Sequence, residues 1–102
     1  MEKRVSLTRL KPEYRERYLE AHRNVPPEVL RRYRAAGMKH CSVHLLGDQL
    51  VLVTEVEDQG AFDRAMKDDP VDRLWQDQVG PMKDDSDWQR MECVFTVDFG
   101  HE

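Results

Sequence analysis

Residues 38–57 read MKHCSVHLLGDQLVLVTEVE, and this stretch is the most regularly patterned part of the 102-residue chain. Two runs, Met38–Leu46 and Leu50–Glu57, are rich in apolar and β-branched residues, and Gly47-Asp48-Gln49 separates them. Two such runs joined by a short turn that contains glycine are typical of a β-hairpin. We therefore predict two antiparallel strands at the centre of the fold.

Both faces of the second of these strands carry apolar side chains. Leu50, Leu52 and Val56 fall on one face, because side chains alternate along a strand. Val51 and Val53 fall on the other face. A sheet with one wet face has apolar residues mainly on the opposite side. We therefore expect both faces to be covered, one by helices and the other by a second copy of the chain.

The residues before the hairpin predict a strand and an interrupted helix. Lys3–Leu10 alternates in the manner of a half-buried strand. Pro12 suits the first turn of a helix, and Pro26-Pro27 interrupts that helix because proline has no N–H group to donate. The helix resumes over Glu28–Ala36, and Gly37 suits its C-terminal end.

The residues after the hairpin complete the pattern. Ala61–Lys67 and Val71–Val79 have the apolar spacing of short helices, and Gln89–Phe99 alternates as a strand does. The resulting order, β-α-β-β-α-β, is the ferredoxin-like arrangement. We predict a single α+β domain over residues 1–102, with an antiparallel sheet, helices on one face, and a dimeric α+β barrel as the assembly.

The composition predicts a folded domain with a small core. Charged residues make up 35% and apolar residues 39%, but 16 basic and 20 acidic side chains nearly cancel to a net charge of −4. Disorder needs low hydrophobicity together with high net charge. No apolar run approaches the roughly 18 residues of a membrane span, and the first residues lack the apolar stretch of a signal peptide. Cys41 and Cys93 are too few for a disulfide framework, so we expect a cytoplasmic protein without membrane contact.

The charges are unevenly distributed along the chain. Residues 1–40 carry 11 basic and 5 acidic side chains, whereas residues 41–102 carry 5 and 15. A basic segment is one property of nucleic-acid-binding proteins. Here acidic residues interleave with the arginines, and no aromatic platform or phosphate loop accompanies them, so we predict no nucleic-acid partner. The opposite charges of the two segments instead favour contact between two copies of the chain.

Tyr18 and His22 are the best candidates for chemistry. Residues four apart on a helix lie on one face, with Cβ atoms about 5–6 Å apart. Histidine titrates near neutral pH and tyrosine forms hydrogen bonds, so the pair suits proton transfer on a hydroxylated substrate. The same spacing also fits a packing stripe that includes a hydrogen-bonded histidine. From the spacing alone, both interpretations stay open.

Other candidate residues have weaker signals. His40 and His44 point the same way on a strand but lie about 13 Å apart at about 3.3 Å per residue, too far for one metal ion. We predict no metal site and no cofactor. Cys41 has no base or positive helix end beside it in sequence, so we interpret it as a small core or pocket residue. Trp75 fits either a core position or the flat wall of a sugar site.

A series of motifs resembles the L-rhamnose mutarotase family and runs through nearly the whole chain in the order of that family. The motifs are Tyr18-x-x-x-His22, Pro27-Glu28, Gly37, His40-Cys41-Ser42-Val43-His44-Leu45, Thr54-Glu55-Val56-Glu57 and Asp69-Pro70-Val71-Asp72-Arg73-Leu74-Trp75. The resemblance implies a small cytoplasmic homodimer with a ferredoxin-like fold. It also implies a cofactor-free isomerase that interconverts the α and β anomers of 6-deoxy sugars such as L-rhamnose.

The resemblance also implies roles for individual residues. The catalytic histidine of the family falls on His22, and its sugar-contacting tyrosine falls on Tyr18. The remaining substrate contacts fall on Cys41, Leu74 and Trp75. These five positions form the candidate site that the resemblance implies, with His22 and Tyr18 as the catalytic pair.

Three positions depart from the family pattern. The family usually has tryptophan where Pro26 stands, tyrosine where Cys41 stands and tryptophan where Leu74 stands. All three changes remove aromatic rings from the implied sugar pocket, while the proton-transfer pair is retained. Two alternatives therefore stay open beside L-rhamnose. One is L-fucose, the sugar of some family relatives, and the other is a monooxygenase-like or non-catalytic protein of the same dimeric fold class.

Overall fold

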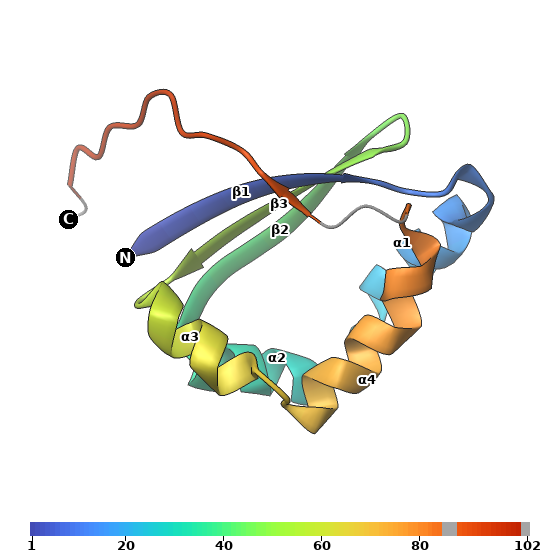
Figure 1. Ribbon diagram of the computed structural model, residues 1–102, viewed down its shortest axis with the longest axis horizontal. Coiled ribbons are helices and arrows are strands. Elements are labelled where there is room, and N and C mark those ends of the chain that lie inside the picture. Colours follow the sequence, from blue (N-terminus) through green and yellow to red (C-terminus); the bar gives the residue numbers. More distant parts are fainter. Residues whose placement is uncertain (85–87, 101–102) are drawn as a thin grey trace.

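The computed structural model describes residues 1–84 and 88–100, which form one sheet and a layer of helices (Figure 1). The strands are β1 (Glu2–Arg9), β2 (Met38–Leu46), β3 (Gln49–Val56) and β4 (Gln89–Arg90). The helices are α1 (Arg15–Arg23), α2 (Pro27–Ala35), α3 (Gln59–Met66) and α4 (Pro70–Val79), with 3₁₀ turns η1 (Pro12–Tyr14) and η2 (Gly80–Met82).

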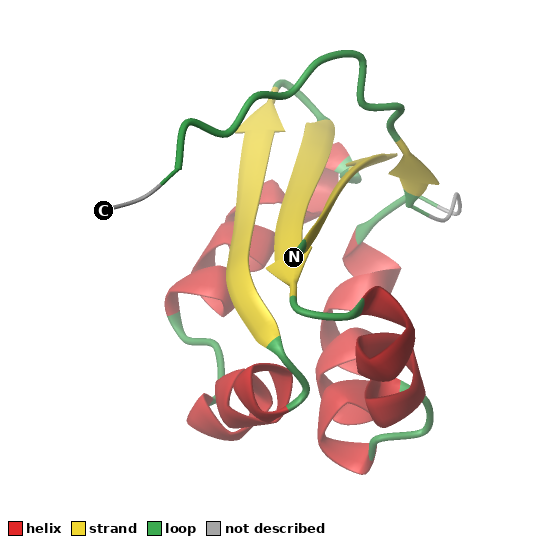
Figure 2. Cartoon of the chain, turned by 90° about the vertical axis from the view of Figure 1, so that its left-hand side faces the viewer, coloured by secondary structure: helices red, strands yellow, loops and turns green. Residues whose placement is uncertain are grey.

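The sheet has the strand order β2-β3-β1-β4, and each neighbouring pair is antiparallel. All the helices lie on one side of the sheet (Figures 1 and 2). This arrangement confirms the predicted α+β fold with a ferredoxin-like order of elements. The helical part of each half is split in two, because prolines at positions 27 and 70 each begin a new helix.

The hairpin between β2 and β3 fixes the register of the sheet. Leu46 pairs with Gln49, so the loop consists of Gly47 and Asp48 alone. Gly47 has a φ of +61°, and glycine tolerates this left-handed conformation because it has no Cβ. A glycine at the first central position is typical of the two-residue turns that match strand twist. The backbone N–H of Leu10 donates to Asp48 O at 2.7 Å and ties the hairpin tip to the chain after β1.

The two faces of β3 differ in burial as the alternation predicted. Leu50 and Val56 are 1% and 0% exposed, because they point toward the helices. Val51 and Val53 on the opposite face are only partly buried. The helix side of the sheet therefore carries the core, and the outer side keeps a partly exposed apolar surface.

The core is concentrated at one end of the space between sheet and helices. It contains Leu10, Tyr18, Val29, Leu50, Trp75, Val79 and Met82. In the described part of the chain, the longest helix has 10 residues, and no helix is long and apolar enough to cross a membrane.

The predicted C-terminal strand is wrong over most of its length. Only Gln89–Arg90 is strand, and one further bond joins Met91 N to Val5 O. The chain then leaves the sheet, and Phe95 and Phe99 are 81% and 92% exposed. The tail extends away from the helices in Figure 1. A segment with alternating apolar residues forms a stable strand only where its apolar face is buried, and nothing in a single chain covers this segment.

Asp69 caps the N-terminus of α4, and its substitution tests how much this cap stabilises the fold. Its Oδ1 accepts from the N–H groups of Val71 and Asp72, and its carboxylate lies 3.4 Å from Arg32. We expect Asp69→Ala to lower the free energy of unfolding by about 1–2 kcal/mol, because two N–H groups lose their acceptor. Urea denaturation measures this change. Asp69→Asn keeps an acceptor oxygen and should lose less than half as much; equal losses would assign the effect to the ion pair instead.

Candidate active site

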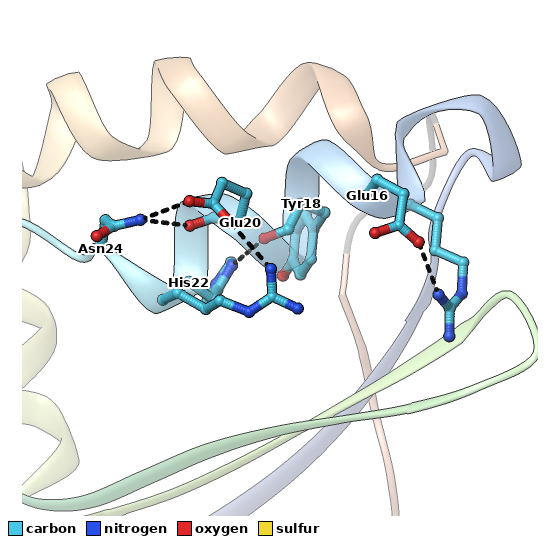
Figure 3. A network of polar contacts seen from close by, with 7 residues as sticks. Glu16, Tyr18, Glu20, His22 and Asn24 are labelled. Atoms are coloured by element: carbon cyan, nitrogen blue, oxygen red, sulfur yellow. Dashed lines mark hydrogen bonds and ion pairs between the residues drawn. The ribbon is translucent and has the colours of Figure 1, made fainter.

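Tyr18 and His22 lie on the side of α1 that faces the sheet (Figure 3). Their rings stack with centroids 4.3 Å apart and planes inclined by 29°. This contact follows from the spacing of four residues, which places both side chains on one helix face. Tyr18 is 4% exposed, and His22 is partly buried. The predicted pair is therefore assembled within one helical turn.

One backbone contact determines which nitrogen of His22 is available. Nδ1 lies 3.0 Å from the carbonyl oxygen of Tyr18, and a carbonyl only accepts hydrogen bonds (Figure 3). Nδ1 therefore carries the proton in the neutral ring, and Nε2 has the free lone pair. The result is an imidazole with fixed orientation whose outer nitrogen is a base.

Trp75 of α4 also packs against His22. The two rings meet edge to face, with centroids 5.2 Å apart and planes inclined by 71°. Trp75 is 7% exposed, so most of its surface is buried in the core. Aromatic pairs of this kind stabilise a structure by about 0.5–1.5 kcal/mol beyond the burial itself. The imidazole is therefore in contact with two buried rings, Tyr18 and Trp75.

The hydroxyl of Tyr18 stays neutral over a wide pH range. Burial, followed by the nearby thiol of Cys41, raises the pKa of Tyr18 to about 12. Within residues 1–84 and 88–100 no side chain or backbone group forms a hydrogen bond with this hydroxyl. Tyr18 is therefore a neutral donor whose bonding capacity is available to a ligand.

Cys41 lies on the side of β2 that is directed toward the helices. It pairs with Thr54 in register with Val43 and Leu52, so its side chain points to the helix side. Burial raises the pKa of the Cys41 thiol, although the residue as a whole is exposed. The thiol is therefore partly desolvated and directed at the helices. The interpretation of Cys41 as a small core or pocket residue stays a prediction.

A second polar group, formed by residues of α2 and α4, lies near the same thiol. The hydroxyl of Tyr33 donates to Asp72 Oδ1 at 2.5 Å, and Gln76 Nε2 lies 3.4 Å from each of these oxygens. Burial, followed by the bond to Asp72, raises the pKa of Tyr33, and the thiol of Cys41 contributes to the same shift. Cys41 is therefore within electrostatic range of both Tyr18 and Tyr33. Periodicity does not predict this group, because Tyr33 lies 39 residues from Asp72 and 43 residues from Gln76 in the chain.

The cluster does not include Leu74, His40 or His44. Leu74 is 72% exposed, so the chain alone does not bring it to His22, and its role stays a prediction. His40 and His44 lie on the outer side of the sheet, where each has a ring nitrogen within 3.2 Å of Ser42 Oγ. Among the described residues, no three metal-ligating side chains gather at one place.

A separate open groove of about 580 Å³ borders the exposed side of α1. Glu16, Glu20 and Asn24 line it together with Gln78 of α4. Glu20 accepts hydrogen bonds from Arg23 at 2.9 Å and from Asn24 at 3.0 Å (Figure 3). These exposed contacts complete the end of α1, and the groove contains none of the candidate residues.

Comparison with known families gives one match over almost the whole chain. The sequence model of the L-rhamnose mutarotase family matches residues 3–97. No curated protein has significant sequence similarity to the chain.

Solved structures of three other proteins share the fold. An L-rhamnose mutarotase from Formosa agariphila superposes with a TM-score of 0.82 at 15% identity, covering 96% of this chain and 100% of that one. Tetracenomycin F2 cyclase from Streptomyces glaucescens gives a TM-score of 0.72 at 15% identity, covering 98% and 100%. A Nitrosomonas europaea protein described as an antibiotic biosynthesis monooxygenase gives 0.65 at 13%, covering 94% and 92%. At these identities the likeness shows the fold alone.

The raised pKa of Tyr18 predicts a specific alkaline destabilisation. An unfolded tyrosine ionises near pH 10 and the folded one near 12, so only the folded state keeps the proton between these values. The stabilisation is complete below about pH 10 and is lost as the pH rises toward 12. We expect Tyr18 to contribute up to about 2–3 kcal/mol to this loss. Urea midpoints between pH 9 and 11.5 should fall less steeply in Tyr18→Phe, and equal slopes would contradict the burial of this hydroxyl.

Proposed function

The chain belongs to the L-rhamnose mutarotase family, and we propose that it interconverts the α and β anomers of a 6-deoxyhexose such as L-rhamnose. The observation that carries this proposal is the bond between His22 Nδ1 and the Tyr18 carbonyl, which leaves Nε2 as an oriented base. Anomer exchange needs a proton to move between two oxygens of one sugar. A single oriented imidazole performs this transfer.

The proposed reaction moves one proton and breaks one bond. His22 Nε2 takes the proton of the anomeric hydroxyl, the bond between C1 and the ring oxygen breaks, and C1 becomes an aldehyde. The proton passes from His22 to the released oxygen, which becomes a hydroxyl group. Rotation about the bond between C1 and C2 presents the other face of the aldehyde, and the same steps in reverse close the ring as the other anomer.

The neighbours of His22 have supporting roles in this proposal. Tyr18 stays protonated because of its raised pKa, so it donates a hydrogen bond that orients the sugar beside the imidazole. Trp75 fixes the His22 ring by packing against it. The small side chain of Cys41, on the helix side of β2, leaves more room for a ligand than an aromatic ring at this position would. Leu74 contributes a sugar contact in the family pattern, and we keep this role as a prediction.

We also propose that the chain acts as a cytoplasmic homodimer. The outer face of the sheet has partly buried apolar residues at Val5, Leu7, Val51 and Val53. The C-terminal tail adds large exposed side chains that a second copy would bury. A cytoplasmic location is supported by the free, exposed thiols of Cys41 and Cys93, which persist in a reducing compartment.

Saturation-transfer NMR on equilibrated L-rhamnose tests the reaction. The intact protein should accelerate exchange between the two anomer signals, and His22→Ala should slow the catalysed exchange by about 10²–10⁴-fold because the base is removed. His40→Ala is the matched control, since His40 lies on the outer side of the sheet, and it should keep the rate of the intact protein.

The outcomes of this experiment separate the alternatives. Exchange by His22→Ala at the rate of the intact protein would show that His22 is not the base. Sugar binding without faster exchange would indicate a non-catalytic binding protein. A faster rate with L-fucose than with L-rhamnose would change the substrate while leaving the proposed reaction intact.

Sedimentation tests the homodimer. At micromolar concentration the protein should sediment with twice the 12.1 kDa mass of the chain. Val53→Asp places a charge on the outer face and should shift the equilibrium toward single chains by at least about tenfold, because a buried unpaired charge is costly. Ala65→Asp on the exposed side of α3 is the control and should leave the mass unchanged. A single-chain mass for the intact protein would contradict the proposal.

A further inference from the structure

The carboxylate of Asp72 is held in one orientation at the contact between α2 and α4. Tyr33 donates to its Oδ1 at 2.5 Å, and Gln76 Nε2 lies 3.4 Å from the same oxygen. Both contacts end on Oδ1. A carboxylate has two oxygens with about four acceptor positions, so Oδ2 keeps its capacity to bind a ligand.

The partners of Asp72 are neutral, which distinguishes it from its acidic neighbours on the same turn. Asp69 lies 3.4 Å from Arg32, and Asp68 lies 3.2 Å from Arg73. Over residues 1–84 and 88–100, no ion pair includes Asp72. Asp72 is partly buried in the first turn of α4, where the helix dipole stabilises a negative charge. No basic side chain therefore neutralises this carboxylate.

The position of Asp72 connects it to the candidate site. It lies one turn before Trp75, the residue that packs on His22. Its donor Tyr33 is within electrostatic range of Cys41, as Tyr18 is. The catalytic pair and the Tyr33–Asp72 pair thus share Cys41 as a neighbour on the helix side of the sheet.

We propose that Asp72 binds a hydroxyl group of the sugar and determines which sugars the site accepts, an inference that rests on the proposed function. A carboxylate accepts charge-assisted hydrogen bonds from neutral polyols and repels anionic ligands. The site therefore selects neutral sugars over uronates and sugar phosphates. Tyr33 is the positioning residue, because it touches Asp72 and fixes the orientation of the carboxylate.

The test compares Asp72→Asn with deoxy sugars in the anomer-exchange assay. The reference sugar is the one that the intact protein interconverts fastest, and the probes are its analogues that each lack one ring hydroxyl. For the hydroxyl bound by Asp72, the intact protein should lose about 10- to 100-fold in kcat/KM when that hydroxyl is absent. Asp72→Asn should lose the same factor on the reference sugar and no further activity on that analogue.

Asp77→Asn is the matched control, because Asp77 is an exposed residue of α4 and the substitution removes the same charge. It should keep the kcat/KM of the intact protein on every sugar. Unchanged kcat/KM in Asp72→Asn, or an equal loss on all the analogues, would overturn the inference while leaving the mutarotase activity established. Absence of exchange in the intact protein on every sugar would instead overturn the proposed function.

If thermal melting shows that Asp72→Asn is unfolded, Tyr33→Phe provides a second test of the inference. This variant releases the carboxylate but keeps the ring, which packs near Phe62 with centroids 6.1 Å apart. We expect KM to rise by about 3- to 10-fold with kcat nearly unchanged, because hydroxyl binding acts on the ground state and the transition state alike. A fall in kcat with an unchanged KM would assign Tyr33 a structural role and overturn its role as a positioning residue.

Discussion

The register of β3 between β1 and β2 is the constraint on which the site depends. Cys41 points toward the helices because it is paired with Thr54, on the face that also carries Leu50 and Val56. A slip of one residue would turn every side chain of β2 to the opposite face. Cys41 would then face outward. The two-residue turn at Gly47 and Asp48 prevents this slip, and its bond to Leu10 couples the hairpin to the first strand.

The second constraint is the stacking of aromatic rings at the contact of α1 and α4. His22 is held by a backbone acceptor and by ring contacts with Tyr18 and Trp75. A base fixed in this way loses little rotamer freedom when a substrate binds, because the protein has already ordered it during folding. The core of this small domain therefore has two roles. The rings that stabilise the helix layer also orient His22 Nε2, the proposed base.

The sequence predicted local features well and distant contacts poorly. The hairpin, the faces of β3 and the pairing of Tyr18 with His22 follow from periodicity over a few residues, and the structure contains them. The segment Gln89–Phe99 has the same alternation, but a strand also needs a surface to bury against, and a single chain provides none beyond Arg90. Periodicity indicates which residues share a face, and it does not show whether that face has a partner.

The group formed by Tyr33, Asp72 and Gln76 lay beyond sequence reasoning for a different reason. Its members come from two helices and meet only after both pack on the sheet, so neither helix predicts the contact by itself. The resemblance drew attention to Leu74 and Trp75 on the same helix and passed over Asp72. A pattern carried over from a family shows the residues that a chain shares with it, and it misses those that the chain has in addition.

The departures from the family pattern and the Tyr33–Asp72 pair support the same proposal, in which hydrogen bonds replace ring stacking in the recognition of the sugar. An aromatic ring contacts the apolar face of a pyranose, and such stacking depends little on the orientation of individual hydroxyl groups. A fixed carboxylate responds to the position of one hydroxyl, because a hydrogen bond weakens steeply as its angle departs from linearity. The chain has Cys41 where the family typically has a ring, and the hydrogen-bonded pair of Tyr33 and Asp72 lies near this thiol. The recognition that we propose therefore relies more on hydrogen-bond geometry than on stacking, while the proposed proton transfer stays with His22 and Tyr18.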